Sequence, residues 1–204
     1  MTFLPQVTRT ASTLKTALVA SSLLAFSCVG HADWSLNNEQ SQLNFISVKK
    51  SAVAEIHTFK SISGTLSDSG EVALSIDLSS VDTKIQIRDE RLLKVLSNAG
   101  AFPKAELTGT VDTSEVKALK PGETLAQDLS LTLSLHGQSH TVPATVKVTA
   151  LTDGKLEVST QQPVILNAAD FKLVEGVNEL KQLAGLPSIS LAVPVTAELV
   201  FDAK

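Results

Sequence analysis

The sequence has one cysteine and no tyrosine among its 204 residues. The cysteine is Cys28, so residues 33–204 cannot form a disulfide among themselves and have no thiol for metal binding or nucleophilic attack. Basic clusters are also missing, which removes the electrostatic basis for binding nucleic acid. The sequence contains neither a G-x-S-x-G nucleophile elbow nor a glycine-rich phosphate loop. These absences argue against an enzyme, and they give no indication of a bound cofactor.

Residues 1–32 have the composition of a secretory signal peptide. They contain no Asp or Glu, and their only formal charges, Arg9 and Lys15, precede a mostly apolar stretch over residues 16–26. That stretch is shorter than the roughly 20 residues that a membrane-spanning helix requires. We therefore expect the segment to direct export from the cytoplasm.

The small residues Gly30 and Ala32 occupy the positions typical of a cleavage site, which predicts cleavage before Asp33. Cys28 offers a second route, lipidation as a lipoprotein. The bulky Phe26 close to Cys28 fits that route poorly, so soluble export is the favoured prediction.

Cleavage would leave a single domain, residues 33–204, with 15 basic and 21 acidic residues. A chain of this size can bury one ordinary core without covalent cross-links. Its net negative charge mainly favours solubility.

The pattern of residues 33–204 is dominated by alternation of apolar and polar side chains, which is typical of strands with one buried face. Eight strands are predicted, over residues 43–48, 55–66, 71–80, 105–113, 126–136, 140–151, 155–166 and 190–201. A one-sided sheet of this length must cover its apolar face. It can do so by closing into an eight-stranded antiparallel barrel or by forming a two-sheet sandwich, and the periodicity is compatible with both.

Two segments change from strand spacing to helical spacing. In the first, Leu92, Leu93 and Leu96 cluster on one side, while Asp89 and its polar neighbours face water. In the second, residues 170–184, apolar side chains recur at the spacing of an amphipathic helix or an ordered lid. Short helices are therefore expected between strands.

The order of motifs around the first helix is distinctive. Residues 80–83 read Ser-Val-Asp-Thr, Arg88-Asp89 follows, and Phe102-Pro103 ends the segment before the next strand. This stretch resembles the signature of the YceI-like family of periplasmic lipid-binding proteins. One departure is Arg91, where many members carry a histidine.

The resemblance implies a lipocalin-like barrel with short helices near its openings. It also implies a polyisoprenoid or another amphiphilic lipid held along the barrel axis. The expected partner is thus an isoprenoid such as a quinone or polyprenol, with transient contact with the membrane or a membrane protein during loading. The sequence favours no particular oligomeric state.

Inward residues of the best alternating strands are the candidate ligand-binding residues. They are Phe59, Leu74, Ile76, Leu131, Leu133, Val146, Val193 and Val195. Arg88 is a further candidate, because a guanidinium can hold a polar or phosphate head group. The favoured role of Arg88, however, is an ion pair or backbone clamp that fixes the helix against the sheet.

Two other functions remain open. The barrel interior could be filled by side chains, which would leave a stress-response or protein-interaction module without a ligand. A metal-assisted hydrolase would need His57, His136 and His140 to converge, because catalytic zinc sites usually have three protein ligands. For His136 and His140, the favoured interpretation is two turn histidines in water.

Overall fold

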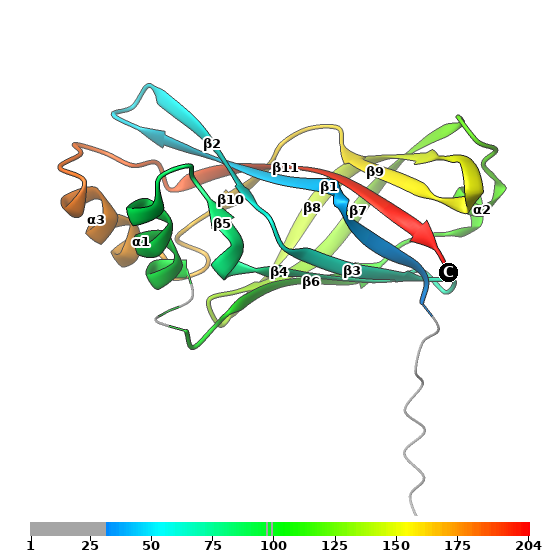
Figure 1. Cartoon of the computed structure of the whole chain (residues 1–204), viewed down its shortest axis with the longest axis horizontal. Coiled ribbons are helices and arrows are strands. Elements are labelled where there is room, and N and C mark those ends of the chain that lie inside the picture. The colour runs from blue at the N-terminus through cyan, green and yellow to red at the C-terminus, as the bar shows by residue number, and fades with distance from the viewer. Residues whose placement is uncertain (1–31, 97, 99) are drawn as a thin grey trace, which may run out of the picture.

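The inward-facing apolar residues of eight strands are brought together by closure of one antiparallel sheet into a barrel (Figure 1). The computed structural model describes residues 32–96, 98 and 100–204. The eight strands of the ring, in spatial order, are β1 (Ala32–Lys49), β3 (Ile62–Ser67), β4 (Glu71–Asp77), β6 (Lys104–Thr110), β7 (Thr124–Leu135), β8 (Gln138–Ala150), β9 (Leu156–Thr160) and β11 (Ala192–Ala203). Pairing of β11 with β1 closes the ring. The predicted barrel is therefore confirmed, and the two-sheet sandwich is excluded.

Two of the predicted strands are each divided in two. The predicted strand 55–66 becomes β2 (Val53–Phe59) and β3, which pair with opposite halves of β1. The predicted strand 155–166 becomes β9 and β10 (Val164–Asn167), which pair with opposite halves of β11. Strands β2 and β3 therefore act as one bent strand, and so do β9 and β10. The bend between β9 and β10 includes Pro163, which has no backbone N–H to donate to a ladder.

The first strand is much longer than the predicted 43–48. Its early part is concealed in the sequence by a polar run, residues 37–41, at which the register with β11 shifts. The side chain of Asn37 accepts hydrogen bonds from two following backbone N–H groups, and the Ser41 hydroxyl accepts one from Val200. These bonds stabilise a bulge, so β1 continues across an interruption that period-two analysis reads as a loop.

The helices lie at the two ends of the barrel (Figure 1). Helices α1 (Gln86–Leu96) and α3 (Val174–Leu183) lie within the two segments predicted to be helical, and they pack against each other at one end. The five-residue helix α2 (Ser114–Ala118) lies at the other end, just after a predicted strand that ends earlier than expected. The remaining short elements are η1 (Leu78–Ser80), β5 (Val81–Asp82) and η2 (Thr152–Gly154).

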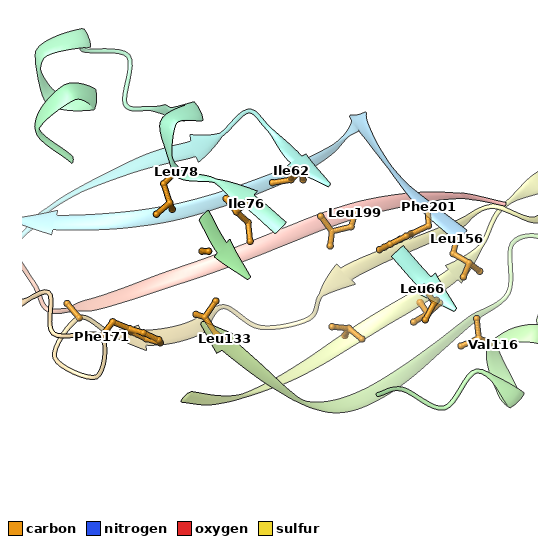
Figure 2. Packing of buried hydrophobic residues seen from close by; sticks show 14 of the residues in the cluster. Ile62, Leu66, Ile76, Leu78, Val116, Leu133, Leu156, Phe171, Leu199 and Phe201 are labelled. Carbon is orange, nitrogen blue, oxygen red and sulfur yellow. The ribbon is translucent and has the colours of Figure 1, made fainter. Parts of the chain in front are cut away.

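The buried residues form one cluster inside the barrel, with side chains from several strands pointing toward its axis (Figure 2). Leu78 is the most buried large side chain, with 1% of its surface exposed. Val116 of α2 and Phe171 before α3 close opposite ends of the cluster. The alternation predicted from the sequence therefore assigns the inward faces correctly.

Within the described ranges, no helix is both long enough and apolar enough to cross a lipid bilayer. Residues 1–31, which hold most of the predicted signal peptide, lie outside those ranges.

Candidate functional site

The barrel encloses an apolar cavity of about 360 Å³. Its wall includes every one of the eight apolar residues predicted as ligand-binding, namely Phe59, Leu74, Ile76, Leu131, Leu133, Val146, Val193 and Val195. Along β11 the wall runs from Val193 to Phe201, about 26 Å at the usual rise of a strand. The interior is thus elongated and hollow, although many of its side chains are inaccessible to bulk solvent.

The helices contribute part of the wall that the sequence analysis did not assign to the site. Leu92, Val95 and Leu96 of α1 line the cavity, as do Val177 and Leu180 of α3. Gly176 allows the two helices to approach closely, because a Cβ at that position would collide with the Val95 side chain. The helical spacing of these residues is the signal that could have placed them over the opening.

The wall is almost entirely aliphatic. Its aromatic residues are four phenylalanines. Two of them, Phe45 and Phe59 on neighbouring strands, stack with their ring centroids 5.3 Å apart. Polar residues contribute at a few places only, and these are Ser47, Ser63, Gln127, Thr160 and Ser190. Such a surface can hold a long hydrocarbon by burial of its apolar area and offers few hydrogen bonds to fix a polar group.

Ser47 connects the cavity to a buried histidine. Its hydroxyl lies 2.8 Å from Nε2 of His57, and the Phe45 ring packs against the imidazole with a centroid separation of 5.2 Å. His57 is only 3% exposed, and within the described part of the chain its Nδ1 atom has no hydrogen-bond partner. Burial, followed by the nearby Arg88 charge, lowers the pKa of His57 from its ordinary value and so favours the neutral imidazole.

Arg88 does not lie on the cavity wall. Its Nη1 donates to a Glu55 carboxylate oxygen at 2.8 Å, and its Nη2 donates to the Thr83 carbonyl oxygen at 2.6 Å. Glu55 also pairs with Lys49 at 2.8 Å, and this hydrogen bond, together with the Arg88 charge, lowers the pKa of Glu55. Arg88 therefore fastens α1 to β2, and this geometry favours its role as a clamp over that of a head-group ligand.

Asp89 does not simply face water, as its helical position suggested. Its carboxylate accepts hydrogen bonds from both the backbone N–H and the hydroxyl of Thr83, at 2.8 and 2.5 Å. Thr83 is 3% exposed, so these bonds satisfy a buried corner. Arg88 and Asp89 together fix the corner between β5 and α1, which explains why the two residues follow the Ser-Val-Asp-Thr segment.

The three histidines do not converge. His136 lies in the β7–β8 turn with its Nδ1 atom 3.0 Å from the Phe171 carbonyl oxygen, and His140 is paired with Leu133 across the strands. His140 packs edge-on against the Phe171 ring, while His57 lies on β2. Among residues 32–96, 98 and 100–204, no group of three or more His, Cys, Asp or Glu side chains could hold a metal ion.

Comparison with known proteins agrees with this geometry. No curated protein matches the chain. Among solved structures, a polyisoprenoid binding domain from Saccharophagus degradans, implicated in plant cell wall breakdown, is 38% identical, with a TM-score of 0.82 over 85% of this chain and 99% of that one. BcnA from Burkholderia cenocepacia is 16% identical, with a TM-score of 0.63 over 81% of this chain and 98% of that one, and it shares the fold. The model of the YceI-like domain matches residues 34–201, so this chain belongs to the YceI-like family.

Proposed function

We propose that this protein binds a long isoprenoid, such as a quinone or polyprenol, inside the barrel and carries it through the periplasm. The observation that carries the proposal is the elongated aliphatic cavity of about 360 Å³, whose walls come from the barrel strands and both end helices. The 38% identical Saccharophagus degradans domain, itself a polyisoprenoid binding domain, supports an isoprenoid over other hydrocarbons.

The proposed mechanism is sequestration without covalent chemistry. Each buried CH₂ group contributes about 0.8 kcal/mol, so a tail of a few isoprene units suffices for tight binding. The head group would lie at the end covered by α1 and α3, where Ser47 and Ser190 contribute to the wall. Ser47 is suited to orient a carbonyl or hydroxyl group, because its hydroxyl is already held by His57.

Export is the second part of the proposal. It is supported by residues 1–32, which lack acidic residues and combine two basic residues with an apolar stretch. Intact mass of the protein recovered from the periplasm would place the new N-terminus at Asp33. Recovery of the uncleaved chain from the cytoplasm would contradict it.

Binding is tested by titrating purified protein with tritiated geranylgeraniol, an isoprenoid alcohol of four isoprene units. We expect saturable binding of one molecule per chain, with stearic acid competing less well. Absence of uptake of either probe would favour the alternative, a barrel that acts without a ligand.

A further inference from the structure

The end of the barrel that carries α1 and α3 also exposes apolar side chains to solvent. Six large apolar residues are strongly exposed within the described part of the chain, and all six belong to elements of this end. They are Val53, Ile56, Ile85, Ile87, Ile165 and Leu183, here called the docking patch. A group of exposed aliphatic residues at one end of a protein is typical of an interaction site.

Strand register shows that part of the docking patch is continuous across the outer wall. Ile56 of β2 pairs with Ile46 of β1, and Ile165 of β10 pairs with Pro194 of β11. Phe45 pairs with Val195, so Ile46 and Pro194 are the next neighbours on the outward face. A row of four apolar residues thus crosses four strands, and its outermost members, Ile56 and Ile165, are 66% and 61% exposed.

Helices α1 and α3 and the β1–β2 hairpin lie at the same end of the barrel (Figure 1). The Arg88–Glu55 ion pair holds α1 beside β2, and the backbone N–H of Lys50 in the hairpin turn donates to the Ser188 carbonyl oxygen after α3. Lys94 of α1 lies 3.6 Å from Glu179 of α3. These contacts tie α1, α3 and the β1–β2 hairpin together at the end of the barrel that carries the exposed residues.

The charge of this end differs from that of the rest of the protein. Residues 49–55, 84–96 and 170–190 carry eight basic and six acidic residues, whereas the remainder of 33–204 carries seven basic and fifteen acidic residues. Lys50 and Lys84 at this end are exposed, and neither forms an ion pair with any described residue. The molecule therefore has one cationic, apolar end and an acidic body.

We propose that the docking patch binds an anionic lipid surface, with its aliphatic residues in the interface and Lys50 and Lys84 against the head groups. A second copy of the chain is less suitable as the occupant, because a symmetric dimer would place the cationic ends against each other. An anionic bilayer offers both an apolar phase and the complementary charge. This proposal rests on the proposed carrier function. Helices α1 and α3 cover the end of the cavity through which a lipid would pass, so the docking patch lies where a carrier would meet the membrane.

The test is co-sedimentation of the purified protein with vesicles of phosphatidylcholine alone or mixed with phosphatidylglycerol. The N-terminus of the purified protein is first identified from its intact mass. We expect binding to the anionic vesicles that falls as sodium chloride is raised. The Ile56→Thr/Ile165→Thr variant should bind at least about tenfold more weakly, because two large aliphatic groups no longer enter the interface. The Lys50→Gln/Lys84→Gln variant should lose about thirtyfold, the effect of two charges near an anionic surface.

The matched control is Lys120→Gln/Lys147→Gln, which removes two exposed lysines from the opposite half of the barrel and should bind like the wild type. None of these substitutions touches the cavity wall, so geranylgeraniol binding measured in parallel should be unchanged. If the wild type binds anionic vesicles but takes up no geranylgeraniol, the carrier function is refuted and the docking surface stands. Failure of the wild type to bind anionic vesicles, or equal binding by all variants, would overturn the docking proposal. A wild-type dimer that Ile56→Thr/Ile165→Thr converts to a monomer would assign the patch to a second copy instead and would also overturn it.

Discussion

Filling the cavity should weaken ligand binding strongly without unfolding the protein. Ala144 lies on β8, lines the cavity and pairs with Leu129, another wall residue. Replacing it with phenylalanine puts a phenyl ring into the path of the tail. The ring takes the place of about five tail carbons, one isoprene unit, and at ~0.8 kcal/mol each the loss is about 4 kcal/mol. This corresponds to a dissociation constant raised about a thousandfold, since each 1.4 kcal/mol is tenfold.

The effect on stability should be small. Added bulk usually costs about 1–3 kcal/mol in a well-packed core, but the 360 Å³ of free space can accept the ring. We expect the free energy of unfolding of Ala144→Phe to stay within about 1 kcal/mol of wild type in urea titrations, because the strain of overpacking is avoided.

The matched control is Ala126→Phe on the adjoining strand β7, where the side chain is exposed on the outer face. Both proteins would be titrated with tritiated geranylgeraniol. Equal affinity of Ala144→Phe and Ala126→Phe would refute the argument that the ligand lies along the barrel axis. Severe destabilisation of Ala144→Phe would show that the interior has no room for a tail.

Three further predictions concern the structure around the cavity. Because burial lowers the pKa of His57, the neutral His57 contributes fully to the free energy of unfolding above about pH 6.5, and this contribution is lost as pH falls toward the folded pKa. Urea titrations from pH 7 to 5 should therefore show a decrease in the free energy of unfolding. The decrease should be smaller in His57→Gln and unchanged in His140→Gln. Arg88→Met should lower the free energy of unfolding by about 2 kcal/mol, because two hydrogen bonds from a charged group are lost. It should also speed the release of geranylgeraniol. An equal effect of Arg91→Met, on the same helix, would contradict the role of Arg88 as a clamp. Leu78→Ala should cost about 3 kcal/mol in chemical unfolding, since Leu78 is 1% exposed, and a cost below about 1 kcal/mol would show that the site is loosely packed.

The cavity wall could be predicted from the sequence because a strand sets its faces by simple alternation. Once Leu74 and Ile76 are assigned inward on one strand, and Leu131 and Leu133 on another, closure of the sheet brings them together without further information. The resemblance to the YceI-like family supplied the closure itself, which alternation alone did not distinguish from a sandwich.

The parts that were missed depend on contacts between distant segments. The polar run at residues 37–41 conceals the length of β1, because its bulge is stabilised by Ser41 bonding to β11, which lies at the other end of the chain. The share of the wall contributed by α1 and α3 depends on where the helices dock, and the spacing of Leu92 or Leu180 shows only that each has an apolar side. Likewise, the partner of Arg88 is Glu55, 33 residues away, and no local pattern identifies it.

The most direct test of isoprenoid binding is native mass spectrometry of the protein purified from the cells that express it, followed by organic extraction and identification of any bound molecule. We expect a one-to-one adduct that extraction identifies as an isoprenoid, and loss of that adduct in Ala144→Phe. A clean apo mass for the wild-type protein, together with no uptake of added geranylgeraniol or quinone, would contradict it.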